Sequence, residues 1–121
     1  MSHFDELGEA RLRAITGELV ERMAADVMIG FHFARVDLGR LREMEYQHAA
    51  ELLGGPVQYC GRPLRAAHAP HRIAGGHFGR RSQLLRQILE RHEVPEAVRD
   101  HWLAETEALR DDIVGNRPDC H

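Results

Sequence analysis

The sequence predicts an all-α fold. Apolar residues recur at steps of three and four along four long segments, which is the spacing of one helical face. No stretch alternates apolar and polar residues for long enough to indicate a strand. A chain of 121 residues is long enough to form one hydrophobic core, and it contains no internal repeat or low-complexity stretch. We therefore expect one domain over residues 1–121, with residues 116–121 as a frayed polar tail.

The composition argues against several classes of function. A formal net charge of −3 gives no indication of binding to nucleic acid or to an anionic membrane. No apolar run is long enough to span a bilayer, and the first residues lack the apolar stretch of a signal peptide. All 16 basic residues are arginine, which excludes lysine Schiff-base chemistry and a Walker-type phosphate loop. Cys60 and Cys120 lack CxxC spacing and are typical of reduced thiols, so we expect a cytoplasmic protein.

The first predicted helix runs from about Ala10 to Asp26. Its apolar face comprises Leu12, Ile15, Leu19 and Met23, with Val20 at the border. The sequence MIGFHF then interrupts the helical period at Gly30. We expect Phe31 and Phe33 on this corner to be buried, because two exposed aromatic side chains on one turn would be costly.

The second predicted helix carries two ionisable residues on its apolar face. It begins after Asp37, a favourable N-cap, and ends at Leu53, before a Gly-Gly-Pro sequence. Its inner face is predicted to comprise Leu38, Leu41, Glu45, His48 and Leu52. Burying a carboxylate or an imidazole without a partner is costly. Glu45 and His48 therefore either pair with each other, three residues apart on one helix, or face a cavity that holds a polar group.

A short turn that begins at Pro63 carries a candidate metal ligand. Proline suits the first position of a helix, because its φ is fixed and its missing N–H is not needed there. His68 lies at the end of this turn. It is either a surface histidine or a neutral imidazole that binds a metal, for which a heme iron is the best candidate.

Two further helices complete the prediction. The first runs from about His77 to His92, and its inward residues are Phe78, Leu85, Ile88 and Leu89. Val94 and Pro95 interrupt the pattern, and Pro95 begins a last helix that extends to about residue 114. The predicted core residues of this helix are Val98, Trp102, Leu109 and Ile113.

Several stretches of the chain match the pattern of one protein family. FDELG at 4–8 matches an opening of aromatic, acidic, aliphatic and glycine residues. The run FARVDLGRLREMEYQHAAELLGGPVQYCGRPLRAAH follows and ends at His68, and RIAGGHF and the Val-Pro break come after it. In these stretches the chain resembles the truncated hemoglobins, the short two-over-two globins, and specifically their first group. The resemblance implies a two-over-two α-helical sandwich around a heme b.

The resemblance also implies a role for individual residues. His68 would be the proximal iron ligand, Phe33 would pack against the porphyrin, and Arg40 would pair with a heme propionate. The residues implied on the ligand side of the iron are Leu41, Glu45 and His48, with Met44 at the flank. Those implied on the proximal side are Leu64, Ala67, Ile73 and Phe78.

Three departures from the family pattern concern the ligand side. The family usually has a Phe-Tyr pair where this chain has Leu19 and Val20, and the tyrosine hydroxyl donates a hydrogen bond to the ligand. Val20 has no such donor. Glu45 occupies the position of the usual glutamine; as an anion it repels a negative ligand atom, whereas burial would favour its protonated, donating form. His48 replaces a bulky apolar residue.

These residues leave several functions open. The first is binding of O2, NO or CO at a His-ligated iron, as in oxygen binding or transport, with redox or gas chemistry favoured over simple oxygen storage because of Val20. The second is a peroxidase- or oxygenase-like heme enzyme in which Glu45 and His48 act as acid and base. The third is a six-coordinate redox or electron-transfer globin with His48 as the sixth ligand. A heme-free helical interaction domain remains as the last alternative. The sequence identifies neither a reductase partner nor an oligomeric state.

Overall fold

The computed structural model describes residues 2–59 and 75–110, and every regular element in these ranges is helical. The elements are α1 (His3–Leu7), α2 (Glu9–Ala25), the 3-10 helix η1 (Gly30–Phe33), α3 (Leu38–Leu52), α5 (Gly75–Arg91) and α6 (Glu96–Ala108). The predicted all-α class is confirmed. None of the helices in the described ranges combines the length and apolarity needed to cross a bilayer. The predicted turn at Pro63 and the predicted tail lie outside the described residues.

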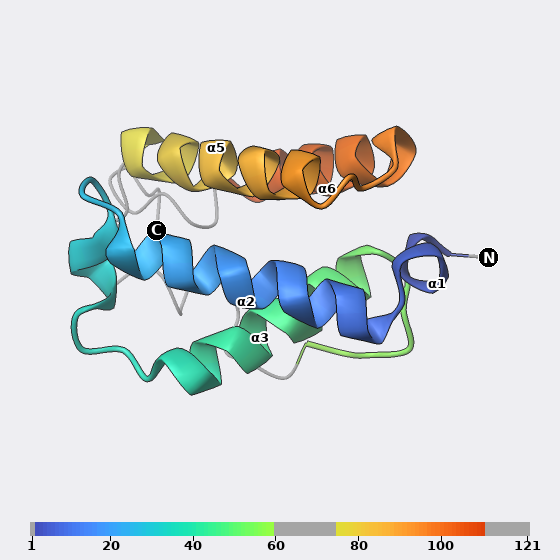
Figure 1. The fold of residues 1–121 in the computed structure, drawn as a ribbon, viewed down its shortest axis with the longest axis horizontal. Helices are drawn as coiled ribbons and strands as arrows, with labels where there is room; N and C mark the ends of the chain where they lie inside the picture. Colours follow the sequence, from blue (N-terminus) through green and yellow to red (C-terminus); the bar gives the residue numbers. More distant parts are fainter. Residues whose placement is uncertain (1, 60–74, 111–121) are drawn as a thin grey trace, which may run out of the picture.

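The helices are arranged in two layers (Figure 1). One layer holds α2 and α3, and the other holds α5 and α6. α2 packs against α3, α5 and η1, and α5 packs against α6, so α2 lies at the centre of the arrangement. The most deeply buried apolar side chains come from both layers: Leu12, Ile15, Leu19, Val20, Met23, Ala50, Leu85, Ile88, Leu89 and Val98. The core therefore sits between the layers.

Local capping signals determine where the helices begin and end. At the start of α3, the Asp37 side chain accepts a hydrogen bond from the backbone N–H of Arg40 at 3.2 Å, as predicted for an N-cap. After α3, Gly54 adopts a φ of +82°, which only glycine reaches without steric cost. α1, which the sequence pattern did not predict as a helix, begins with a reciprocal pair of hydrogen bonds between Ser2 and Asp5.

The apolar faces predicted for the long helices are buried in α2, α5 and most of α6. The predicted inward residues of α2 and α5 are all at most 1% exposed. In α6, Val98 and Trp102 are buried, but Leu109 is only half-buried because it is the C-cap residue after the helix has ended. The predicted core residue Ile113 lies outside the described residues.

The fully buried face of α3 differs from the predicted one, although the predicted Leu38, Leu41 and Leu52 still pack against the core. The buried residues of this helix are Tyr46, Ala49 and Ala50, whereas the predicted residues are only half-buried: Leu38, Leu41, Glu45, His48 and Leu52. The two alanines are small and buried, α3 packs against α2, and the Arg13 guanidinium of α2 covers the Tyr46 ring at 3.8 Å from its centroid. The face with Glu45 and His48 consequently borders the core instead of filling it.

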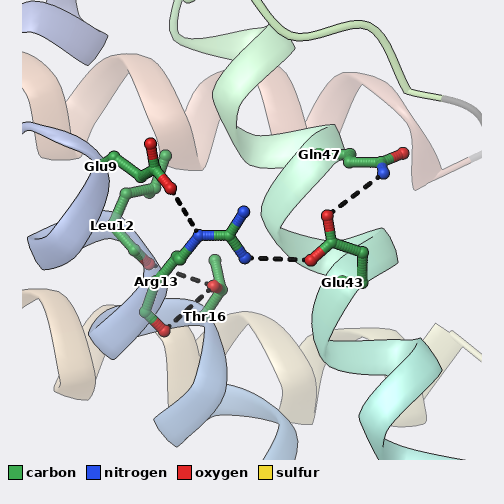
Figure 2. A network of polar contacts seen from close by, with 6 residues as sticks. All are labelled: Glu9, Leu12, Arg13, Thr16, Glu43 and Gln47. Atoms are coloured by element: carbon green, nitrogen blue, oxygen red, sulfur yellow. Dashed lines mark hydrogen bonds and ion pairs between the residues drawn. The ribbon is translucent and has the colours of Figure 1, made fainter.

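A network centred on Arg13 joins α2 to α3 (Figure 2). Arg13 donates hydrogen bonds to Glu9 at 3.0 Å and to Glu43 at 2.9 Å, and Gln47 donates to Glu43 at 3.3 Å. Arg13 and Glu43 are each 44% exposed, so solvent screens their attraction. The network therefore orients α3 on α2 more than it stabilises the fold.

The corner between α2 and η1 is held by Asp26. Its carboxylate accepts hydrogen bonds from the backbone N–H groups of Met28 at 3.0 Å and Ile29 at 3.2 Å. The same carboxylate accepts two hydrogen bonds from Arg80 of α5, at 3.0 Å and 2.8 Å. Asp26 thus ties the end of α2 both to the following turn and to the other layer.

Phe31 on this corner is exposed, which corrects the expectation that both phenylalanines are buried. Its side chain is 62% exposed, whereas Phe33 is half-buried and packs against the core. A 3-10 helix has three residues per turn, so residues two apart point to different sides. The Phe31 ring packs instead beside the imidazoles of His32 and His77, with ring centroids 4.1 Å and 5.5 Å away.

The Asp26–Arg80 contact predicts a pH dependence of stability. The hydrogen bonds from Arg80 lower the pKa of the Asp26 carboxyl below its ordinary value. Such a group stabilises the fold at pH values above its unfolded pKa of about 4, and the contribution disappears as the pH falls through the folded pKa. We expect Asp26→Asn to be less stable than wild type at neutral pH, with a gap that shrinks below about pH 4. Urea unfolding over a pH series measures this, and a gap independent of pH would contradict it.

Candidate functional site

The half-buried face of α3 collects the residues that the sequence predicted on the ligand side. Leu41, Met44, Glu45 and His48 recur at steps of one, three and four along this helix, and all four are partly exposed. The buried residues Tyr46, Ala49 and Ala50 lie on the adjacent side of α3. Leu41 packs against the core with part of its surface, and the half-buried Met44, Glu45 and His48 can contact a further group.

Glu45 forms an ion pair with Arg81 of α5. The Arg81 Nη2 group donates to a Glu45 carboxylate oxygen at 2.9 Å, and the two side chains are 18% and 20% exposed for Glu45 and Arg81 respectively. The pair connects the two layers of the fold. The Glu45 oxygen in this pair accepts a hydrogen bond from Arg81, so its contact in this structure is that of an acceptor.

Arg81 is a residue that the sequence analysis missed. It lies three residues after Phe78 and four before Leu85, and both of these are buried. A charged residue at that spacing interrupts the apolar face of α5 just as Glu45 interrupts that of α3. This was the signal that could have identified it. Its Nη1 group is buried and has no hydrogen-bond partner among the residues that the structure describes.

His48 contacts the segment that follows α3. Its imidazole meets the Tyr59 ring edge-on, with centroids 5.6 Å apart and planes at 87°. The backbone N–H of Tyr59 donates to the Glu51 carboxylate at 3.0 Å, which folds this segment back along the helix. The described contact of Glu45 is thus with Arg81, and that of His48 is with Tyr59. A pairing of Glu45 with His48 is not among these contacts.

The remaining predicted site residues lie around this face or outside the described ranges. Phe33 is half-buried, Arg40 is exposed in the first turn of α3, and Phe78 is 1% exposed. The Arg110 guanidinium lies over the Phe78 ring, 4.6 Å from its centroid. The other predicted residues lie outside the described ranges: Leu64, Ala67, His68 and Ile73.

Position 20 of α2 offers no hydroxyl to this face. Val20, at the position where the family resemblance implied a tyrosine, is completely buried in the core. Within the described ranges, no three His, Cys, Asp or Glu side chains gather closely enough to hold a metal ion.

The two-layer arrangement of helices, with a partly polar face between the layers, is the architecture of a small globin. A family model described as bacterial-like globin matches residues 2–115, and the chain therefore belongs to the bacterial-like globin family.

Curated relatives of the chain are group 1 truncated hemoglobins. The protein from Nostoc commune is 31% identical over 71 residues, which cover 59% of this chain and 60% of that protein. The protein from Mycolicibacterium paratuberculosis is 29% identical over 79 residues, which cover 64% of this chain and 58% of that protein. The chain thus spans about three fifths of the length of these curated relatives.

Solved structures share the fold over nearly the whole chain. The truncated hemoglobin of Tetrahymena pyriformis in its Fe(III) form has a TM-score of 0.88 at 24% identity, covering 96% of this chain and 100% of that chain. The 2/2 hemoglobin of a Synechococcus species, in the cyanomet state and with covalently attached heme, has a TM-score of 0.88 at 22% identity, covering 97% and 100%. The resemblance to the truncated hemoglobins and the predicted two-over-two fold are confirmed.

Proposed function

We propose that this globin binds one heme b along the half-buried face of α3 and, through its iron, the diatomic ligands O2, NO or CO. The family match over residues 2–115 carries the proposal and also supports a single domain. The Synechococcus structure that shares the fold holds a heme, and the curated relatives are named as hemoglobins.

The residues of the site fit such a group. Leu41 and Met44 offer half-buried apolar surface on the same face of α3, and Phe33 lies half-buried at the adjacent corner. The exposed Arg40 suits a propionate, because its guanidinium is permanently charged and forked. When bound, heme supplies an iron with an open coordination position. His68 is assigned as the proximal ligand, with Leu64, Ala67, Ile73 and Phe78 beside it.

Redox or gas chemistry is proposed in preference to oxygen storage. The supporting observation is the composition of the ligand side: Val20 is apolar and buried, while the ionisable side chains Glu45 and His48 lie on the half-buried face of α3. A histidine and a carboxylate can accept and return protons, whereas Val20 offers no hydrogen bond. Reduction of the iron would require a reductase partner, and a cytoplasmic location agrees with two cysteines that lack CxxC spacing.

A peroxidase- or oxygenase-like enzyme is the second candidate. The observation that favours it is the same pair of ionisable groups, Glu45 and His48, one helical turn apart on one face. In this function one group would take a proton from the substrate while the other returns it. Peroxide turnover that disappears in the double variant Glu45→Gln/His48→Leu would support the enzyme, and turnover that survives would exclude these acid–base roles.

Titration of the purified chain with hemin tests heme binding. We expect a Soret band that saturates at one hemin per chain and shifts when CO is added to the reduced protein. The absence of a Soret band would overturn the proposal. The ferric spectrum also tests ligation by His48, because a low-spin spectrum that becomes high-spin in His48→Ala would show that His48 is the sixth ligand.

A further inference from the structure

The buried Nη1 group of Arg81 is unusual among the described arginine contacts. A buried N–H group without a hydrogen-bond partner is costly, so folded proteins rarely leave one unpaired. Arg81 uses its Nη2 group for Glu45 at 2.9 Å, whereas Nη1 has no partner in the described ranges. The Arg81 side chain is 20% exposed and its Nη1 atom is buried, so little solvent compensates for the missing bond.

The neighbouring Arg80 provides a direct comparison on the same helix. Arg80 donates from Nε and Nη2 to Asp26, at 3.0 Å and 2.8 Å, and from Nη1 to Gln83 at 2.7 Å. Its nitrogens are thus distributed over two protein acceptors. Arg81 has one carboxylate as its acceptor, and its buried Nη1 group has none in the described ranges. The two consecutive arginines thus differ: Arg80 ties the corner to α5, whereas Arg81 has a nitrogen that is free to donate to a bound group.

The position of Arg81 determines where that donor lies. Its ion pair with Glu45 brings it to the α3 face that we assign to the ligand side of the heme. Glu45 offsets part of the positive charge, and its hydrogen bond holds the guanidinium in one orientation. Val20 of α2, where the family usually has a tyrosine, has no hydrogen-bond donor to offer to the ligand.

From these observations we propose that Arg81 is the ligand-side hydrogen-bond donor of this globin, and that it favours small anions at the sixth coordination position of the iron. The inference rests on the proposed function, since it requires a bound heme. A charge-assisted hydrogen bond from a guanidinium favours anionic ligands, such as fluoride, over neutral ligands such as CO.

Fluoride binding to the ferric heme-loaded protein tests the role of Arg81. We expect Arg81→Met to weaken fluoride binding by about ten- to a hundredfold, because one hydrogen bond between charged groups is lost. CO affinity of the reduced protein should change less than about threefold, since CO accepts hydrogen bonds poorly. Arg80→Met is the matched control: it removes an ion pair from the same helix without touching Glu45, and fluoride affinity should remain at the wild-type value.

The double variant Arg81→Met/Glu45→Gln separates donation by Arg81 from repulsion by Glu45. Removal of Arg81 alone leaves an unpaired carboxylate, which would itself repel fluoride. If the lost donor is the cause, fluoride binds the double variant at least about tenfold more weakly than the single variant Glu45→Gln, which carries the same glutamine. Equal affinities of these two variants, or an unchanged affinity in Arg81→Met, would overturn the inference.

Glu45→Gln provides a second test that keeps Arg81 and does not depend on the folding of an Arg81 variant. Without the compensating carboxylate the guanidinium carries its full charge, so fluoride affinity should rise by several-fold. An unchanged or lower affinity would contradict the proposal. Failure of the wild-type chain to take up hemin would remove both proposals, whereas normal heme spectra with fluoride affinity insensitive to Arg81 would remove this one alone.

Discussion

His68→Gly is expected to lower the affinity of the chain for hemin by at least about a hundredfold. Substitutions of residues that merely support a metal ligand typically cost about 10- to 100-fold in affinity, and removal of the ligand itself costs more. Added imidazole should enter the space left by the side chain and restore the Soret spectrum, because it supplies the same nitrogen ligand. Hemin titration with and without imidazole measures both effects.

His71→Gly is the matched control for this variant. His71 lies three residues further along the same segment and is not assigned as a ligand, so the variant should retain hemin at close to the wild-type affinity. If His68→Gly keeps a wild-type spectrum while His71→Gly loses it, the assignment of the proximal ligand is wrong. If neither variant changes the spectrum, the iron is held by a residue elsewhere in the chain.

Leu85→Ala is expected to have the largest effect on stability. Leu85 is completely buried on the face of α5 that packs against the rest of the core. Truncating a buried leucine to alanine removes apolar contacts and leaves a cavity, at a cost of about 2–5 kcal/mol. Small domains are stable by only about 5–15 kcal/mol, so this loss should lower the urea midpoint markedly.

Arg86→Ala is the control for that prediction, since Arg86 is the next residue of α5 and is exposed. Its free energy of unfolding should remain within about 0.5 kcal/mol of wild type. A loss for Leu85→Ala no larger than that for Arg86→Ala would contradict the packing of α5 against the core. The measurement uses the heme-free chain, so that heme binding does not contribute to stability.

Local signals accounted for most of the fold. The Asp37 cap, the glycine at 54 and the Val94-Pro95 break act over a few residues, so the sequence predicted α3, α5 and the start of α6 closely. Which face of α3 is fully buried could not be predicted from such local signals. It depends on how α3 packs against α2, which buries Tyr46, Ala49 and Ala50 and outweighs the leucine pattern.

The candidate site was predicted only in part, for a similar reason. Glu45 and His48 were identified because they interrupt an apolar pattern, but their partners come from other segments. Arg81 lies 36 positions after Glu45 in the chain, and no spacing rule connects residues that far apart. The prediction that Phe31 is buried was wrong for a geometric reason, since the sequence did not reveal that its turn would be a 3-10 helix.

The Glu45–Arg81 pair also limits how sequences with this site can diverge. Replacing either residue alone leaves a poorly solvated charge without its counter-charge, whereas replacing both by apolar side chains leaves none. Descendants of this chain should consequently keep both residues or exchange both together, and an intermediate with only one of them should be rare. Position 81 would then covary with position 45 even though they belong to different helices.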